Sequence, residues 1–230
     1  MSRTPIIISI EGPIGAGKST ILTELEKYYK GKRNDVIIMR EPVDIWNSVC
    51  DKDGKSIIQK FYADPGKYSF AFQTLICNTI VAEMERNIAE NPFCTTIICE
   101  RSLCASKYVF AKMLYDDSLF EESLYRIYEM AYAQFAQKFV ANKIVYLDCP
   151  PESCILRIKR RRRAGEDLIS LEYLTRCDKY YSEWMKSVNV PMINIDVKTD
   201  MDFSGGLYLS HINRIDEFIF GGSEADWRWK

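Results

Sequence analysis

The amino-acid sequence predicts an α/β fold in which helices cover both faces of a five-stranded parallel sheet, giving a three-layer sandwich. Short apolar runs alternate with long helix-like segments along the chain, which is the pattern of a parallel sheet buried on both sides. A glycine-rich loop follows the first run, and an arginine-rich segment follows the fourth. The sequence has no internal repeat and no linker rich in Pro, Ser or Gly, so we expect residues 1–230 to form a single domain.

The first strand is expected at the run IIISI, which is rich in β-branched residues. The five expected strands are residues 6–10, 36–39, 95–99, 143–148 and 192–197. Helices are expected at residues 20–29, 105–114 and 123–140. Ligands of such sheets bind at the carboxyl ends of the strands, so the residues that follow each strand are the candidates for function.

The loop after the first strand, EGPIGAGKST at residues 11–20, matches the phosphate-binding pattern GxxxxGK[ST]. Glycines let backbone N–H groups surround a phosphate, and the amino terminus of the next helix adds positive potential. Lys18 is placed to neutralise the β- and γ-phosphates, and Ser19 to ligate Mg²⁺. The strand–loop–helix context favours a P-loop NTPase-type fold over a plain glycine-rich turn. We expect ATP to bind at Gly12, Gly15, Ala16, Gly17, Lys18, Ser19 and Thr20.

Composition and charge argue against several other classes of protein. The net charge of −1 gives no overall footprint for nucleic acid or for an anionic membrane, and no apolar run approaches ~18 residues. The start of the sequence does not resemble a signal or transit peptide, so a cytoplasmic protein is expected. The eight cysteines contain no CxxC pair and are expected to be core residues. His211 is expected to be structural, which leaves a carboxylate as the general base.

Charged residues follow the second and third expected strands. Glu41 and Glu100 are carboxylates at strand ends, where a Mg²⁺ ligand and a proton acceptor would be needed. Arg101 is placed to contact a phosphate or to restrain Glu41. Taken alone, Glu41 could cap the next helix and Arg101 could form a structural ion pair. Their position beside the P-loop favours one catalytic site.

The segment RIKRRRR, residues 157–163, has three competing interpretations: a nuclear-localisation or nucleic-acid patch, a solvated helix face, or a lid that closes over phosphates. It follows the fourth strand, ends in a helix-breaking Ala-Gly and precedes the acidic pair Glu166 and Asp167. This position favours a basic lid at about residues 157–167, whose arginines stabilise phosphate charge and exclude water on closure.

Together these motifs resemble one known family, the deoxyribonucleoside kinases, which include deoxycytidine kinase, deoxyguanosine kinase, mitochondrial thymidine kinase and an insect multisubstrate kinase. The resemblance runs along almost the whole chain. Besides the P-loop, it is carried by EPVDIW (41–46), FYADPGKYSFAFQTLI (61–76), CERSLCASKYVF (99–110) and RIKRRRRAGEDLISLEYL (157–174). It implies transfer of the γ-phosphate of ATP to the 5′-hydroxyl of a 2′-deoxynucleoside, with Mg²⁺ as cofactor and a homodimer as the assembly.

The resemblance also implies catalytic roles. Glu41 would accept the proton of the 5′-hydroxyl, and Arg101 would hold that carboxylate and the phosphate. Ser19 and Glu100 would bind Mg²⁺. The catalytic set would be completed by Lys18, Arg161 and Arg163.

The same resemblance implies how the nucleoside binds. Gln73 would contact the Watson–Crick edge of the base through its amide, which donates and accepts together. Tyr62 and Glu166 would hold the sugar 3′-hydroxyl, and the tyrosine would crowd a 2′-hydroxyl. The aromatic walls of the base slot would be Trp46, Phe72 and Phe110. The chain departs from the family pattern at Arg160 and Arg162, which are extra basic residues, and at Gly165, where relatives often carry another acid.

Two positions predict the base preference. Deoxycytidine and deoxyguanosine kinases have an arginine and an aspartate where this chain has Ile80 and Ser106. The uncharged pair is similar to that of thymidine-accepting members, in which there is room for the 5-methyl group. Gln73 can flip its amide to pair with thymine or cytosine. We therefore expect a pyrimidine deoxynucleoside kinase that prefers thymidine, by about 1–3 kcal/mol at most.

Two other functions stay open at this point. A nucleoside monophosphate kinase of the thymidylate kinase type also combines a P-loop, an acidic–arginine motif and a basic lid, but it needs extra cations for the acceptor phosphate and has a glycine-rich turn in place of VDIW (43–46). The second is a non-catalytic nucleotide-binding subunit, or a GTPase-like protein that binds nucleic acid. The intact Lys18, Glu41 and Arg101 argue against the loss of catalysis, and the net charge argues against nucleic acid.

Overall fold

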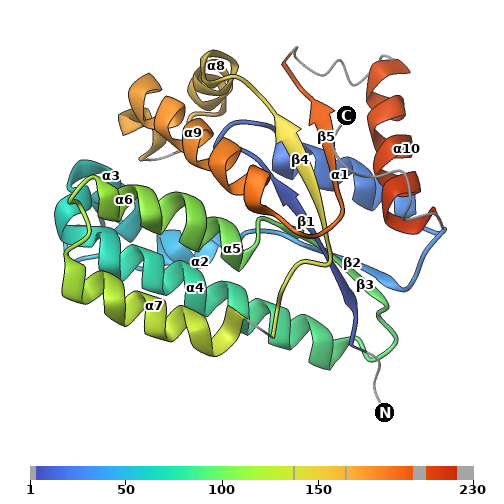
Figure 1. Ribbon diagram of the computed structural model, residues 1–230, viewed down its shortest axis with the longest axis horizontal. Coiled ribbons are helices and arrows are strands. Elements are labelled where there is room, and N and C mark those ends of the chain that lie inside the picture. The colour runs from blue at the N-terminus through green and yellow to red at the C-terminus, as the bar shows by residue number, and fades with distance from the viewer. Residues whose placement is uncertain (1–3, 137, 164, 199–205, 222–230) are drawn as a thin grey trace.

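The computed structural model describes residues 4–136, 138–163, 165–198 and 206–221. Its centre is a five-stranded sheet with the order β2-β3-β1-β4-β5, in which all neighbouring strands are parallel (Figure 1). The strands are β1 (Ile6–Glu11), β2 (Val36–Met39), β3 (Thr96–Glu100), β4 (Lys143–Asp148) and β5 (Met192–Asp196). The predicted α/β fold of the P-loop NTPase type is confirmed, and the strand bounds differ from the predicted ones by at most one residue.

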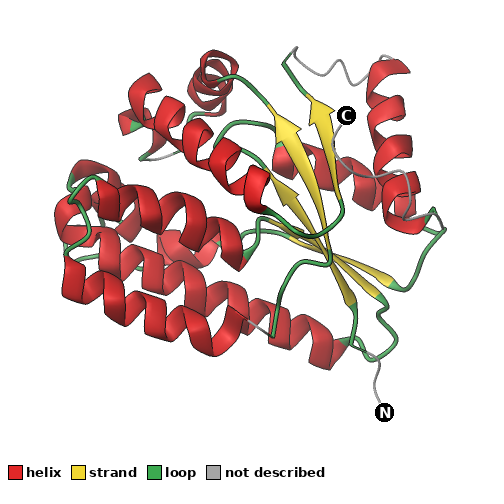
Figure 2. Ribbon diagram, in the orientation of Figure 1, coloured by secondary structure: helices red, strands yellow, loops and turns green. Residues whose placement is uncertain are grey.

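Helices connect the strands and cover both faces of the sheet (Figure 2). The described helices are α1 (Lys18–Tyr29), α2 (Val43–Ser48), α3 (Ile57–Ala63), α4 (Pro65–Glu90), α5 (Leu103–Ala105), the π-helical η1 (Ser106–Ala111), α6 (Lys112–Asp116), α7 (Glu122–Ala136), α8 (Pro151–Arg161), the 3-10 helix η2 (Glu166–Leu168), α9 (Leu171–Ser187) and α10 (Gly206–Phe220). Because α5, η1 and α6 follow one another without a break, the helix predicted at 105–114 is confirmed. The helix predicted at 123–140 ends earlier, where Lys138 N–H turns back to the carbonyl of Phe135 at 3.0 Å.

Each face of the sheet has its own hydrophobic core, because successive side chains of a strand point to opposite faces. On β1, Ile7 packs into the core shared with α4, α7 and η1, whereas Ile8 and Ile10 pack into the core shared with α1, α8 and α10. The sheet is thereby held between two helical layers. The loops that carry the predicted motifs lie at its carboxyl edge, where β1, β2 and β3 end.

The start of α4 is fixed by two sequence features. Pro65 occupies its first turn, where a missing N–H costs nothing, and the Asp64 carboxylate accepts a hydrogen bond from Lys67 N–H at 3.2 Å. This cap begins a helix of 26 residues. Phe72 and Gln73 lie two turns further along it and face the interior, where both are buried.

The described residues agree with two further expectations. The eight cysteines are all free thiols, and all but Cys50 and Cys104 are buried, as expected for core residues. Within the described ranges, no helix has the length and apolar character needed to cross a bilayer.

Candidate active site

A cavity lies at the carboxyl edge of the sheet and encloses about 770 Å³ of empty space, part of it open to solvent. Its walls come from the segments that follow β1, β2 and β3, from α3 and α4, and from the lid segment. Fourteen of the residues predicted from the sequence line it: Gly15, Lys18, Glu41, Trp46, Tyr62, Phe72, Gln73, Glu100, Arg101, Ser106, Phe110, Arg161, Arg163 and Glu166. We call this cavity the acceptor cavity.

A second cavity adjoins it on the side of the P-loop. The two share Gly15, Lys18, Glu100, Arg161 and Arg163 in their linings. The second cavity is further lined by Gly17, Ser19, Thr20, Arg157 and Arg160. Most residues that line the acceptor cavity are apolar, whereas the second cavity is rich in lysine and arginine side chains. Lys18 of the P-loop lines both cavities.

The P-loop adopts a backbone that only glycine accommodates without strain. Gly12, Gly15 and Gly17 have φ values of 143°, 88° and 99°. A Cβ atom on Gly12 would lie 2.8 Å from the carbonyl oxygen of Leu147, and one on Gly15 would lie 2.6 Å from that of Cys154. The amino terminus of α1 has no side-chain cap and no acidic residue in its first turn, an arrangement that suits a phosphate.

Lys18 is buried at the start of α1. Its Nζ donates hydrogen bonds to the backbone carbonyls of Gly12 and Pro13, both at 2.9 Å. Burial, together with the nearby Arg101, lowers the pKa of Lys18 to about 8, and the carboxylate of Glu41 opposes that shift. An anion in the P-loop cavity would favour the charged form of this lysine.

Ser19 and Glu100 lie side by side at the ends of α1 and β3. The Ser19 hydroxyl donates to Glu100 Oε1 at 2.6 Å. Hydroxyl and carboxylate oxygens are ligands that Mg²⁺ prefers, and Mg²⁺ in kinase sites takes few protein ligands beside phosphate and water. The chemistry of these two oxygens therefore fits a Mg²⁺ ion that is bound together with a nucleotide.

Glu41 and Arg101 form a nearly buried ion pair. Arg101 Nη1 lies 3.0 Å from Glu41 Oε1, and the side chains are 11% and 12% exposed, respectively. Burial raises the pKa of the Glu41 carboxyl, and the Arg101 guanidinium opposes that rise. The guanidinium also lies 4.5 Å from the ring centre of Phe110. A carboxylate of raised basicity is thus fixed in the wall of the acceptor cavity.

Arg101 has a left-handed backbone, with φ of 65°, which costs a non-glycine residue about 1–3 kcal/mol. Its N–H donates to the carbonyl of Ile10 at 3.0 Å, and the next N–H, that of Ser102, donates to Glu11 Oε1 at 2.8 Å. Glu11 is fully buried and also accepts from the Ser9 hydroxyl at 2.6 Å. These bonds to β1 hold the turn in place, so Glu11 positions Arg101.

Aromatic rings form the apolar part of the acceptor cavity. Phe72 lies 4.9 Å from Phe61 and 5.9 Å from Trp46, measured between ring centres. The indole N–H of Trp46 donates to the Thr79 hydroxyl at 2.8 Å, which fixes that ring. At these distances the three rings pack on one another, and together they give the acceptor cavity an apolar wall.

Gln73 and Ser106 line the same part of the cavity, and the Ser106 hydroxyl donates to Gln73 Oε1 at 3.0 Å. Ile80, which was expected beside them, is buried and does not line the cavity. Ile76 of the same helix does line it. Seven residues of helix correspond to about 10 Å along its axis. Ile80 is thus two turns from Gln73 and outside the lining, whereas Ile76 is about one turn from Gln73 and within it.

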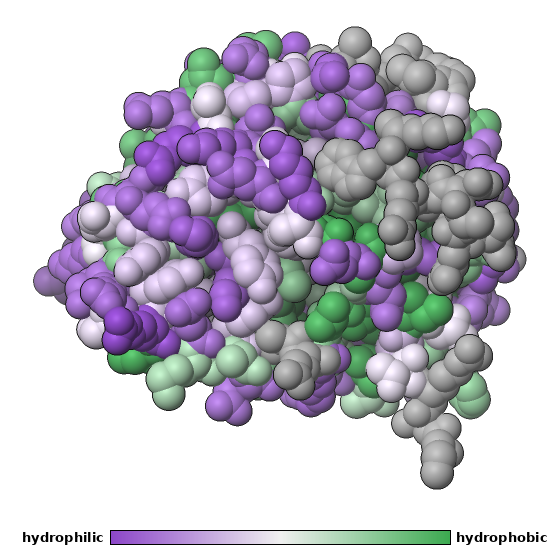
Figure 3. All heavy atoms as spheres, viewed as in Figure 1, coloured by the Kyte–Doolittle hydropathy of each residue, from purple (hydrophilic) through white to green (hydrophobic). Residues whose placement is uncertain are grey.

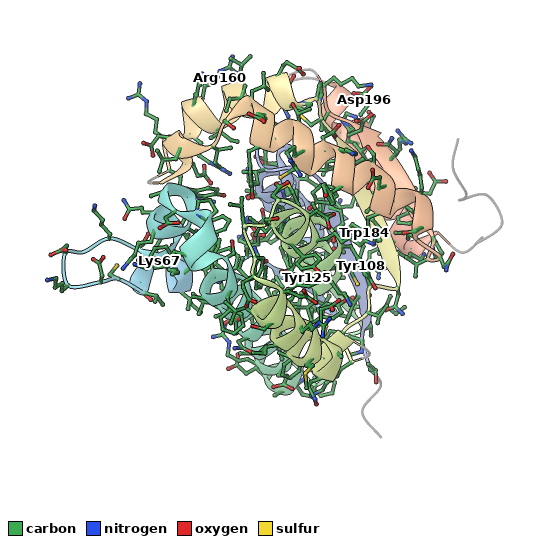
Figure 4. All side chains as sticks on the ribbon, turned by 60° about the vertical axis from the view of Figure 1, so that its left-hand side comes forward. Lys67, Tyr108, Tyr125, Arg160, Trp184 and Asp196 are labelled. Carbon is green, nitrogen blue, oxygen red and sulfur yellow. The ribbon has the colours of Figure 1, made fainter. Side chains whose placement is uncertain are left out.

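In the lid segment, the predicted phosphate-binding arginines contact the predicted sugar-binding acid. Arg161 pairs with Glu166 through Nη2 to Oε1 at 2.7 Å and Nε to Oε2 at 3.0 Å, and Arg163 Nη1 lies 3.4 Å from Oε1. Arg162 adopts a left-handed φ of 53° and ends α8. Arg160 lies on α8 near the outer edge of the molecule in Figure 4. Ala164, within the predicted lid, lies outside the described residues, as do residues 199–205 after the last strand.

Several lining residues were missed by reasoning from the sequence. Arg157 lies inside the predicted lid without an assigned role, and its guanidinium donates to the carbonyls of Ala16 and Val197 at 3.3 and 2.7 Å. The acceptor cavity is also lined by Ile14, Val43, Ile58, Phe61, Ile76 and Tyr173. All of these except Ile58 belong to the P-loop or to the other motifs that carry the family resemblance, and that membership was the available signal. Ile58 looks like an ordinary core residue in the sequence.

Comparisons with known proteins agree with this geometry. The family model described as deoxynucleoside kinase matches residues 8–220. The human deoxycytidine kinase is 30% identical over an alignment that covers 92% of this chain and 90% of that protein. The bovine deoxycytidine kinase is 31% identical, covering 84% of each chain. The thymidine kinase of Ictalurid herpesvirus 1 is 30% identical, covering 79% of this chain and 75% of that one.

Proposed function

The chain belongs to the deoxynucleoside kinase family, and on that premise we propose that it transfers the γ-phosphate of ATP to the 5′-hydroxyl of pyrimidine deoxynucleosides, with thymidine preferred. The observation that carries this proposal is the Glu41–Arg101 pair, 3.0 Å apart, in a cavity that also contains Lys18 of the P-loop. A base, an acceptor pocket and a phosphate site thus adjoin one another.

In the proposed reaction, Glu41 accepts the proton of the 5′-hydroxyl as that oxygen attacks the γ-phosphorus. Burial makes its carboxylate more basic, and Arg101 keeps it oriented. Lys18 contacts the β- and γ-phosphates from the P-loop. Arg161 and Arg163, which line both cavities, stabilise the charge on the transferred group and help to exclude water.

Ser19 and Glu100 are the proposed protein ligands of Mg²⁺. Their oxygens are 2.6 Å apart and lie in the cavity that holds the P-loop. When bound, Mg²⁺ would neutralise charge on the β- and γ-phosphates.

Tyr62 and Glu166 are the proposed contacts of the sugar 3′-hydroxyl. Both line the acceptor cavity. Burial raises the pKa of Tyr62, so its phenol stays a neutral donor. Arg161 pairs with Glu166 at 2.7 Å, and this ion pair would couple sugar binding to the lid.

The proposed base preference rests on an acceptor cavity without a charged pair at the base. Gln73 and Ser106 would supply the polar contacts there, and Ile76, which lines the cavity where Ile80 does not, would supply the apolar wall. A hydrophobic wall of this kind accommodates the 5-methyl group of thymine. Discrimination by such a wall is modest, on the order of 10- to 200-fold per methyl-sized difference.

A competition assay tests this proposal. Equal concentrations of thymidine, deoxyuridine, deoxycytidine, deoxyadenosine, deoxyguanosine and the four ribonucleosides are incubated with ATP, Mg²⁺ and the enzyme, and products are separated by chromatography. Thymidine monophosphate is offered as a substrate in a separate incubation. We expect thymidine monophosphate to form fastest, then the deoxyuridine and deoxycytidine products. A purine deoxynucleoside with the highest kcat/KM would contradict the base preference, and faster conversion of the monophosphate to thymidine diphosphate would support a monophosphate kinase instead.

We further propose that the protein acts in the cytoplasm as a single-domain homodimer that does not bind nucleic acid. Leu124, Ile127 and Met130 on α7 are 36%, 51% and 70% exposed, and apolar side chains lie along the lower edge of Figure 3, where α7 runs in Figure 1. A second copy packed on this strip would bury it. We expect Met130→Glu to convert the dimer to a monomer in light scattering, with Glu129→Gln as the neighbouring control.

A further inference from the structure

Tyr128 on α7 is joined to the base slot by two successive hydrogen bonds. Its hydroxyl donates to Ser106 Oγ at 3.2 Å, and the Ser106 hydroxyl donates to Gln73 Oε1 at 3.0 Å. The three residues come from three helices and are 1%, 2% and 2% exposed, respectively. Tyr128 itself does not line the acceptor cavity, so it can act there only through Ser106 and Gln73.

The ring of Tyr128 is held firmly by other aromatic side chains. It packs against Phe120 and Tyr132, with ring centres 5.8 and 6.5 Å away, and against Tyr125 at 6.4 Å. Tyr125, labelled on α7 in Figure 4, stacks in turn on Tyr115 at 4.3 Å. The position of the Tyr128 hydroxyl is therefore set by the core and not by the ligand.

The direction of the two hydrogen bonds follows from the donors available. Burial raises the pKa of Tyr128, so its phenol keeps the single proton that it donates to Ser106. Ser106 Oγ receives that proton, and the Ser106 hydroxyl is then directed to an acceptor, which is Gln73 Oε1. If the amide of Gln73 were reversed, its N–H₂ group would donate to Ser106 Oγ and the serine proton would turn to the Tyr128 oxygen, so the buried Tyr128 proton would lose the acceptor that it has in this structure. The two bonds therefore favour one orientation of the amide.

The orientation of this amide determines which base it matches. Thymine presents a donor at N3 and an acceptor at O4, whereas cytosine presents an acceptor at N3 and a donor at N4. A glutamine that reverses freely pairs with both patterns, and a glutamine held in one orientation favours one of them. We propose that Tyr128, acting through Ser106, fixes the Gln73 amide and is a specificity-determining residue for the pyrimidine base. This inference rests on the proposed function.

The test compares kcat/KM for thymidine and deoxycytidine in the wild type, Tyr128→Phe, Ser106→Ala and the double variant. A neutral hydrogen bond of ordinary strength corresponds to about 3- to 10-fold. We expect Tyr128→Phe to move the thymidine-to-deoxycytidine ratio toward one by that factor while the KM for ATP is unchanged. Because the two residues act in series, the double variant should show no larger change than Ser106→Ala alone.

Tyr132→Phe is the matched control. It removes a hydroxyl from the same helix, one turn away, whose contact is Cys104 Sγ at 3.5 Å and not the base slot. A general loosening of α7 would lower kcat/KM for both nucleosides equally and leave their ratio unchanged. Ser106→Ala tests the same step if Tyr128→Phe does not fold.

Three results would overturn the inference: a wild-type ratio close to one, a ratio unchanged in both Tyr128→Phe and Ser106→Ala, or an equal change in Tyr132→Phe. A wild type that phosphorylates neither nucleoside would overturn the proposed function and the inference together. An active wild type with a ratio that the variants leave unchanged would overturn the inference alone.

Discussion

Replacing Glu41 by glutamine removes the proposed base and almost no volume. The carboxylate is 12% exposed and lies 3.0 Å from Arg101 in the wall of the acceptor cavity. Loss of a general base lowers the rate by about 10²- to 10⁴-fold, or about 2.7–5.5 kcal/mol of activation free energy. We expect kcat to fall in that range, while the dissociation constant of thymidine stays within about threefold, because the contacts proposed for base and sugar are made by other residues.

The fold should tolerate this substitution. Removing one partner of a buried ion pair costs about 3–5 kcal/mol when the other charge is left uncompensated. In the variant, Arg101 still lies near the negative charges of Glu11 and Glu100. We therefore expect the free energy of unfolding to fall by less than that range. The melting temperature of the Glu41→Gln variant, measured by circular dichroism, separates a catalytic effect from unfolding.

The pH dependence of kcat/KM gives an independent readout. Burial raises the pKa of Glu41 above that of an ordinary glutamate, and only its deprotonated form accepts a proton. Activity should therefore rise as the pH increases through that raised pKa, and this acid limb should be missing in Glu41→Gln. Glu24→Gln, which affects a carboxylate paired with Lys27 on the surface of α1, should behave like the wild type. A Glu41→Gln enzyme within threefold of wild-type kcat, with its acid limb intact, would refute the assignment.

Three further predictions concern the rest of the site. The pKa of Lys18 is lowered to about 8, so ATP binding near pH 8 should take up a proton and weaken above it; a calorimetric enthalpy independent of the buffer would contradict this. Tyr62→Phe and Glu166→Gln each weaken a proposed contact of the 3′-hydroxyl, worth about 0.5–1.5 kcal/mol for the neutral phenol and about 1.5–3 kcal/mol for the carboxylate, so 2′,3′-dideoxynucleosides should be less disfavoured in both; unchanged dideoxy-to-deoxy ratios would place the sugar contact elsewhere. Gly15→Ala puts a Cβ 2.6 Å from a backbone oxygen of α8, so ATP binding should be lost in equilibrium dialysis, whereas Gly54→Ala, whose Cβ would meet nothing within 4 Å, should retain it.

The strands and the P-loop could be predicted because their signals are local. A β-branched run of about five residues followed by GPIGAGKS is compatible with few structures other than a strand, a P-loop and a helix. The sequence therefore predicts β1 and α1 directly. The convergence of Glu41 and Arg101 was also predictable, because the carboxyl ends of parallel strands share one edge of the sheet.

Features that depend on contacts between distant segments could not be predicted. Ile80 was expected at the base from its spacing to Gln73. Which turns of α4 line the cavity depends, however, on the other segments that pack against this helix, and the sequence of α4 alone does not show that. The bond from Tyr128 to Ser106 spans 22 residues, and no local pattern indicates it. The role of Glu11 was overlooked because a residue that ends a strand beside a P-loop looks solvent-facing in the sequence, although its position after five apolar or small residues was a signal of burial.

A crystal structure with thymidine, Mg²⁺ and a non-hydrolysable ATP analogue tests the proposed roles of both cavities at once. We expect the 5′-oxygen within about 3 Å of the Glu41 carboxylate, the thymine edge on Gln73, and the triphosphate on the P-loop at Lys18. Thymidine bound outside the acceptor cavity, or bound with its 5′-oxygen turned away from Glu41, would contradict the assignment of Glu41 as the base.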